Sequence, residues 1–350
     1  MIAARNETTS VRSAVFTIIE LIVALAIASV LLLALAAMFI GTSMSRSELD
    51  KSSRQIESGR YAISILSDEI RHAGYFGPLN NQPLLPASVT SLPDPCDTAL
   101  ASVQASLGLP VQGYVGKSSA SSLDTGKLAC LDAPAGYKPN TGVIVVRRAD
   151  TSIATTSVTN GFFNIQASGC PGDAVRYVFD SYANPSSFTL HANTAPGCLP
   201  LTTAPQANIT PVYIRMFYVS TCSGSDCSVS TADGVPTLKR IDITPAGASA
   251  PVALVDGIEN IQFEYGIDST GADGTPDSYS ATPAFADWPN VMAVRVYVLA
   301  RNLETTPGYV DTKTYSLGPV TFTPASGEVK YRRHAYSELV RLNNPSGRRE

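Results

Sequence analysis

Histidine is scarce in this chain, and proline is missing from its first 77 residues. The three histidines, His72, His191 and His334, show no paired spacing that would hold a metal ion, and no G-x-S-x-G nucleophile motif occurs. Charged residues make up only 15% of the 350 residues, and the net charge of −4 indicates no surface for nucleic acid. The sequence therefore predicts a protein that is not an enzyme, binds no nucleic acid and uses no cofactor.

Proline divides the chain into two parts. All 24 prolines occur from Pro78 onward. Because proline breaks helices, a proline-free stretch of this length permits one long helix, and Gly74 is the residue type that commonly ends one. We therefore expect helix up to about residue 74 and a different architecture beyond residue 77.

The longest apolar run covers residues 16–40 and contains a single charge, Glu20, near its start. As a helix the run would measure about 38 Å, which is enough to cross a hydrocarbon core of about 30 Å. A carboxylate in such a run costs about 2.5–3.5 kcal/mol, so Glu20 is expected to have a partner or a function. Arg5 and Arg12 precede the run and favour a cytoplasmic N-terminus, which would leave the remainder in the periplasm.

Two other interpretations of this run stay open. Glu20 could lie near the end of a helix that reaches the lipid headgroups and have no further role. The run could also be a secretory signal with a cleavage site at Ala34-Leu35-Ala36, although its apolar part is longer than usual and contains an acid. Cleavage after Ala36 would release the remainder from the membrane.

Residues 41–77 are polar but keep a helical rhythm. Leu49, Ile56, Ile63 and Ile70 recur every seven residues, and Leu66 adds to the same face. This stripe predicts an amphipathic helix that packs against a sheet. Charged side chains on the other faces suit solvent or a neighbouring subunit, and pairs within the helix or between subunits are expected among Arg60, Asp68, Glu69 and Arg71.

The rest of the chain contains a connection followed by strands. Residues 78–140 are rich in Pro, Ser, Gly and Ala with little periodicity, and are expected to form a long connection. Short β-branched and aromatic runs then predict strands at residues 143–147, 175–179, 212–219, 238–243, 258–265 and 291–299. The predicted fold class is α+β, with a long N-terminal helix packed on a largely antiparallel sheet.

All six cysteines lie after the apolar run, which favours disulfides in an oxidising compartment. Cys222 and Cys227 enclose a turn-like Ser-Gly-Ser-Asp sequence and are predicted to pair. Two further pairings are considered, with buried free thiols as the alternative: Cys96–Cys130 and Cys170–Cys198.

An acidic loop is predicted at residues 268–277. It concentrates Asp268, Asp273 and Asp277 with two glycines, a composition compatible with Ca²⁺. The spacing does not match an EF-hand, because Ala272 stands where a ligand is required. A hairpin loop between strands is the alternative, so the sequence leaves a metal unassigned.

The start of the apolar run resembles the N-terminus of type IV prepilins and pseudopilins. The run begins Phe16-Thr17-Ile18-Ile19-Glu20, similar to that family's F-T-L-I-E after a short basic leader. The resemblance implies that a prepilin peptidase cuts between Val15 and Phe16 and methylates the new amine. It also implies that Glu20 pairs with the N-terminal amine of a neighbouring subunit during assembly. The family nearly always has Gly before the cut, so Val15 leaves cleavage of this leader open.

Three further stretches resemble the PilW-type minor pilins. They lie at residues 59–77, 255–299 and 332–343, and include Gly59-Arg60-Tyr61-Ala62, Ala73-Gly74-Tyr75-Phe76-Gly77 and Val255-Asp256-Gly257-Ile258-Glu259-Asn260. The resemblance implies a pilin-like fold in five parts. These are a leader at residues 1–15, a transmembrane or filament-core helix at 16–40, an amphipathic half of the helix at 41–77, the connection at 78–140 and a β-rich periplasmic head at 141–350.

The same resemblance implies a minor pilin that primes type IV pilus assembly and lies at or near the filament tip, with links to adhesion and twitching motility. Its partners would be other minor and major pilins, the inner-membrane assembly platform, the prepilin peptidase and a tip adhesin. It would span the bacterial inner membrane once before it enters the pilus. A type II secretion pseudopilin and a membrane-anchored adhesin or ligand-binding module remain the alternatives.

Overall fold

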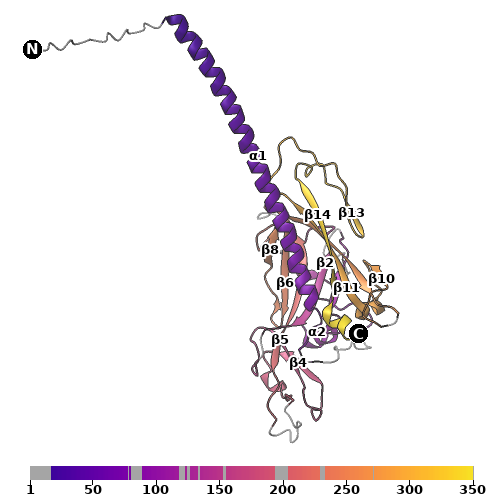
Figure 1. Ribbon diagram of the computed structural model, residues 1–350. Helices are drawn as coiled ribbons and strands as arrows, with labels where there is room; N and C mark the ends of the chain where they lie inside the picture. Colours follow the sequence, from indigo (N-terminus) through magenta and orange to yellow (C-terminus); the bar gives the residue numbers. More distant parts are fainter. Residues whose placement is uncertain are drawn as a thin grey trace, which may run out of the picture. The chain divides into compact units, whose positions relative to one another are not determined.

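The computed structural model describes residues 17–77, 79, 89–117, 123, 127–132, 135–152, 155–193, 204–228, 233–270 and 272–349. The chain forms two compact units, Met1–Asp50 and Lys51–Glu350. The long helix α1, Ile18–His72, contributes to both of them (Figure 1). Its apolar part is long and hydrophobic enough to cross a membrane, although a signal sequence near an N-terminus has the same properties.

The second unit contains two main antiparallel sheets (Figure 1). In the larger sheet the strands follow the order β1 (Val111–Tyr114), β2 (Val143–Ala149), β5 (Ile209–Ser220), β3 (Phe163–Ala167) and β4 (Tyr177–Ser181). The same sheet is extended beside β5 by β6 (Thr237–Thr244), which pairs in turn with β7 (Gly247–Ala248) and β8 (Val252–Asp256). The smaller sheet has the order β10 (Ser278–Ser280), β9 (Ile258–Ile267), β11 (Val291–Arg301) and β14 (Arg333–Arg341).

Short elements complete the head. A two-stranded ribbon joins β12 (Tyr315–Leu317) and β13 (Val320–Phe322). The short helices are α2 (Leu100–Ser106), α4 (Asn343–Gly347) and the 3₁₀ turns η1 (Ala129–Leu131), η2 (Pro185–Ser187) and η4 (Phe285–Asn290). Each of the six predicted strand segments overlaps a strand of the structure, and the α+β class with a long helix and antiparallel sheets is confirmed.

The larger sheet separates two hydrophobic clusters. Successive strand residues point to opposite faces, so Ile144 and Val146 of β2 join one cluster while Val143 and Val145 join the other. The first cluster contains the smaller sheet and the buried face of α1, including Leu66. The central strands are therefore apolar on both sides, which explains why they read as continuous hydrophobic runs in the sequence.

The second cluster changes the interpretation of residues 78–140. This segment, expected to be a connection, contains α2, β1 and η1 among its described parts. Leu107, Leu128 and Leu131 are fully buried against the outer face of the larger sheet. The segment is therefore partly a covering layer of the head. Its elements have three to seven residues each, too short for their periodicity to stand out in the sequence.

The seven-residue stripe on α1 was only partly right as a prediction of the buried face. Ile63 and Ile70 are buried, but Ile56 is 39% exposed and Leu49 is exposed as well. A straight α-helix drifts by about 20° per heptad relative to a strict seven-residue repeat. The face that is buried instead follows Gln55, Gly59, Ala62, Ile63, Leu66 and Ile70.

Gly59 permits the close approach of α1 to β14. A Cβ atom at this position would lie 2.1 Å from Cε2 of Tyr336, a distance that no real contact shows. Glycine inside a helix costs about 1 kcal/mol relative to alanine, so its presence here is explained by packing and not by helix propensity.

Replacing Gly59 with alanine is expected to destabilise the head by about 1–2 kcal/mol, because the clash with Tyr336 outweighs the gain in helix propensity. Trp288, the single tryptophan, is 2% exposed in the first cluster, so its fluorescence reports urea unfolding of the detergent-solubilised protein. In a Tyr336→Ala background the same Gly59→Ala change should become neutral or stabilising. An equal loss in both backgrounds would show that the ring of Tyr336 is not the cause.

Candidate functional site

The N-terminus of α1 is capped by reciprocal hydrogen bonds between Thr17 and Glu20. Oε2 of Glu20 accepts hydrogen bonds from the main-chain N–H and the hydroxyl of Thr17, each at 2.9 Å. The Glu20 N–H donates in return to Oγ1 of Thr17 at 3.3 Å. This is a capping box, in which a threonine before the helix and a glutamate three residues later satisfy free N–H groups.

The capping box gives Glu20 a second role beside the predicted one. The signal was present in the sequence as Thr17-x-x-Glu20 at the start of the apolar run, but the predicted role of Glu20 rested on its charge and on the resemblance to prepilins. Thr17 is a neutral partner, so the capping box satisfies hydrogen bonds without balancing the negative charge. Val15 and Phe16, the predicted cleavage and methylation positions, lie outside the described residues.

Glu69 lies in a buried cluster of charges between α1 and the larger sheet. Its carboxylate receives a hydrogen bond from Nε of Arg148 at 3.1 Å and another from Nη1 of Arg215. The Arg215 guanidinium also lies 4.2 Å from the centre of the Tyr213 ring. Glu69 is only 8% exposed. Its ion pairs therefore join α1 to the head of the same chain and do not face a neighbouring subunit.

The other charges of this helix segment lie at the surface. Arg71 pairs with Glu338 of β14 at 2.8 Å, and Asp68 lies 3.7 Å from His72 one turn along the helix. The first pair joins the helix to the sheet and the second is within the helix. Exposed pairs of this kind contribute about 0–1 kcal/mol, so Glu69 dominates the electrostatics of the region.

The pKa of Glu69 predicts how the stability of the head depends on pH. Burial alone would raise this pKa, but the hydrogen bond from Arg148 and the charges of Arg215 and Arg148 lower it below its usual value. A carboxylate whose folded pKa is lowered stabilises the fold above its unfolded pKa of about 4.3, and this stabilisation is lost as the pH falls through the folded pKa.

Replacing Glu69 with glutamine is therefore expected to cost about 3 kcal/mol or more at neutral pH, because two arginines lose their buried counter-charge. The difference in unfolding free energy between the two proteins should shrink as the pH falls from about 5 to about 3. The exposed Asp68→Asn change is the matched control and should have little effect. A difference that stays constant with pH would contradict the proposed role of the charge.

Two of the predicted disulfides are present in the structure. Cys222–Cys227 closes a loop of the chain after β5, with Cα atoms 5.5 Å apart, and Cys96–Cys130 has a Cα separation of 5.8 Å. Cys170 is disulfide-bonded, and Cys198 lies outside the described residues, so their pairing stays a prediction.

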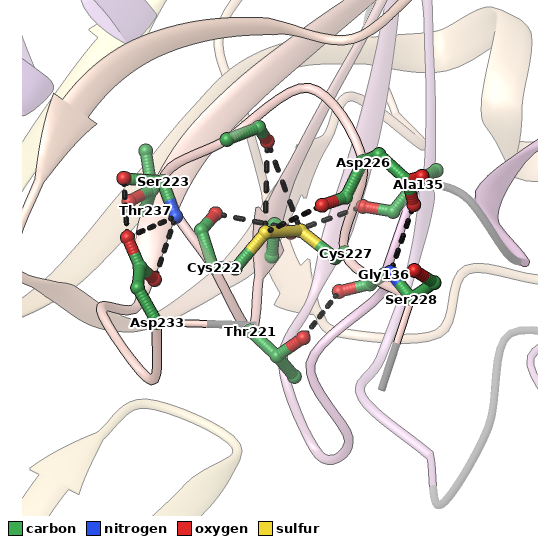
Figure 2. The surroundings of a disulfide bond; sticks show 12 residues. Ala135, Gly136, Thr221, Cys222, Ser223, Asp226, Cys227, Ser228, Asp233 and Thr237 are labelled. Atoms are coloured by element: carbon green, nitrogen blue, oxygen red, sulfur yellow. Dashed lines mark hydrogen bonds between the residues drawn. A yellow bond between two sulfur atoms is a disulfide. The ribbon is translucent and has the colours of Figure 1, made fainter. Parts of the chain in front are cut away.

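The Cys222–Cys227 disulfide lies against the segment that contains Ala135 and Gly136 (Figure 2). The N–H of Thr221 donates to the carbonyl of Gly136 at 2.9 Å. Gly136 has a positive φ of 67°, and a Cβ there would lie 2.2 Å from Cβ of Cys227. The disulfide therefore forms part of the packing between this loop and the layer that covers the larger sheet.

The acidic loop at residues 268–277 uses its carboxylates to fold the chain. Asp268 accepts hydrogen bonds from the Gly274 N–H at 2.9 Å and from Arg349 at 3.0 Å. Asp277 accepts hydrogen bonds from the main-chain N–H groups of Ser269 and Thr270. Within the described part of the chain, no three His, Cys, Asp or Glu side chains are grouped to hold a metal ion. The geometry favours the hairpin-loop alternative over a Ca²⁺ site.

The comparisons with known proteins identify part of the head. The family model for PilW, the type IV pilus-assembly protein W, matches residues 216–344, a little more than a third of the chain. This part of the chain is similar to the PilW family. The matched range contains the motifs at residues 255–299 and 332–343, so the predicted resemblance to PilW is confirmed there.

Two further comparisons complete the findings. Among solved structures, a type IV-like pilin from Thermus thermophilus aligns with 83% of this chain and 97% of its own length, at 9% identity and a TM-score of 0.32. No curated protein sequence matches the chain significantly. The PilW match supports a pilus-related structural pilin, and the apolar N-terminal helix is suited to membrane anchoring.

Proposed function

We propose that this protein is a minor pilin that primes assembly of a type IV pilus and then lies at or near the filament tip. The observation that carries the proposal is the combination of a PilW-type head with an apolar helix that contains one carboxylate, Glu20. Before assembly the protein would be anchored in the bacterial inner membrane with its head in the periplasm. The disulfides support an oxidising compartment for the head.

The physical basis of priming is the charge on Glu20. A carboxylate in a hydrocarbon layer is costly, and an N-terminal amine in the same layer is costly as well. Pairing the two across neighbouring subunits removes both costs, so the first subunits in the membrane need one another before a filament can grow. A cluster of minor pilins would supply this first docking surface for the major pilin on the assembly platform.

The partners follow from this role. We infer that the prepilin peptidase acts between Val15 and Phe16, and that the freed Phe16 amine and Glu20 each pair with a neighbouring pilin. Other minor pilins, the major pilin and a tip adhesin are the expected neighbours. The buried charges of Glu69, Arg148 and Arg215 pair within the head and are not free to bind a neighbour. Assembly would therefore depend on the apolar helix and on exposed surfaces of the head.

Two substitutions at Glu20 separate its two roles. Glutamine can still accept the hydrogen bonds of the capping box but carries no charge, whereas alanine removes both. If the charge drives pairing, Glu20→Gln and Glu20→Ala should both insert into the membrane and both lose co-purification with other pilins and the ability to support piliation. Thr17→Ala is the matched control, because it weakens the cap and leaves the carboxylate in place.

The result that contradicts the pairing role is a Glu20→Gln protein that co-purifies with pilins and supports piliation as the unmodified protein does. Such a result would leave Glu20 as a helix cap only. Membrane insertion of each variant is measured by carbonate extraction, so a failure to insert is recognised separately from a failure to assemble.

A further inference from the structure

The ammonium group of Lys239 lies against the Cys222–Cys227 disulfide. Lys239 belongs to β6 and is fully buried. Its Nζ lies 3.1 Å from Sγ of Cys227 and 3.9 Å from Sγ of Cys222, and it donates a hydrogen bond to the carbonyl of Gly224. Lysine is almost never fully buried unless it is paired, so its place beside a disulfide needs a physical reason.

The positive charge of Lys239 is only partly compensated while the disulfide is intact. Among the residues that the structure describes, no carboxylate forms an ion pair with it. Burial lowers the pKa of Lys239, and the charges of Asp233 and Asp256 offset this only in part. Both carboxylates are hydrogen-bonded elsewhere. Asp233 accepts hydrogen bonds from the N–H and the hydroxyl of Ser223 (Figure 2), and Asp256 accepts one from the hydroxyl of Thr237.

Reduction of the disulfide would supply the missing negative charge. The sulfur atoms of an intact disulfide are neutral and accept hydrogen bonds weakly. A thiolate at the position of either sulfur would instead form an ion pair with the ammonium group, and a nearby lysine lowers the pKa of a thiol. The hydroxyl of Ser220, 2.9 Å from Sγ of Cys227, is a second donor for a thiolate. Lys239 therefore stabilises the reduced form more than the oxidised form, which makes the disulfide easier to reduce.

The two cysteines of the pair differ in burial. Cys222 is fully buried, whereas Cys227 is partly exposed and follows three exposed residues, Gly224, Ser225 and Asp226. A thiol that arrives from solvent therefore meets Cys227 first. Cys222 is then the leaving group, and its sulfur lies 3.9 Å from the ammonium nitrogen. A thiolate of lower pKa leaves faster, so the same lysine favours the rate of exchange as well as its equilibrium.

We propose that Cys222–Cys227 is a redox-active disulfide that exchanges with dithiols, and that Lys239 stabilises the leaving thiolate. A thiolate of the dithiol attacks Sγ of Cys227, which breaks the disulfide, forms a mixed disulfide and releases Cys222 as a thiolate. The second thiol of the dithiol, as its thiolate, attacks the dithiol's own sulfur in the mixed disulfide and releases Cys227, which takes up a proton. The cysteine pair gains two electrons, the dithiol is oxidised to a disulfide, and one proton passes to solvent.

The first test measures the reduction equilibrium of two disulfides in the folded, full-length protein in detergent. The protein is equilibrated with mixtures of reduced and oxidised dithiothreitol, its free thiols are alkylated, and the peptides are quantified by mass spectrometry. Cys96–Cys130 is the internal reference, because both of its cysteines are partly exposed and access alone does not favour Cys222–Cys227. The equilibrium constant for reduction should be about tenfold or more higher for Cys222–Cys227, which corresponds to about 30 mV.

Two results of this test would overturn the proposal. One is that Cys96–Cys130 is reduced as readily as Cys222–Cys227 or more readily. The other is that Cys222–Cys227 is reduced only when the protein unfolds, which circular dichroism of the same samples would show.

The second test uses Lys239→Met, which keeps an unbranched side chain and removes the charge. Because a partly compensated buried charge is lost, the melting temperature of the oxidised protein should stay equal or rise. The equilibrium constant for reduction of Cys222–Cys227 should fall about tenfold or more, and that of Cys96–Cys130 should not change. Lys330→Met, at an exposed lysine, removes the same charge and should change none of these quantities.

An equilibrium constant for Cys222–Cys227 that is the same in Lys239→Met and in the unmodified protein would contradict the role of the ammonium group. If Lys239→Met does not fold, the order in which the two disulfides of the unmodified protein are reduced decides the proposal.

Discussion

The head depends on the burial of one face of α1 against both of its sheets. Ala62, Leu66 and Ile70 are fully buried in a cluster that also contains Val294 and Val298 of β11. The two sheets therefore share a core with the helix, and Gly59 allows the helix to approach closely enough to form it. Because the helix must keep this face toward the sheets, its remaining faces are the ones left to meet other molecules.

Glu20 and Glu69, two of the glutamates of α1, have different roles. Glu69 is neutralised inside its own head by Arg148 and Arg215, so it contributes to the stability of a single chain. Glu20 is hydrogen-bonded by Thr17, which caps the helix but supplies no positive charge. Under the proposed function, the N-terminal amine of a neighbouring pilin supplies the missing positive charge in the membrane.

Sequence patterns predicted the long helix, the antiparallel strands and the Cys222–Cys227 pair because each has a strong local signal. They failed where tertiary contacts decide the outcome. The layer that covers the larger sheet contains short elements such as α2, whose burial depends on distant strands. The partners of Glu69 are 79 and 146 residues away. The Thr17–Glu20 capping box could have been predicted from its spacing.

The most direct test of the account is mass spectrometry of the intact protein and its N-terminal peptide, isolated from native membranes. We expect a chain that begins at an N-methylated Phe16, despite Val15 before the cut. A retained leader would contradict entry into a filament while leaving the pilin-like fold in place. A chain that begins after Ala36 would contradict the account as a whole, because the protein would then be a secreted domain without Glu20 or an anchor.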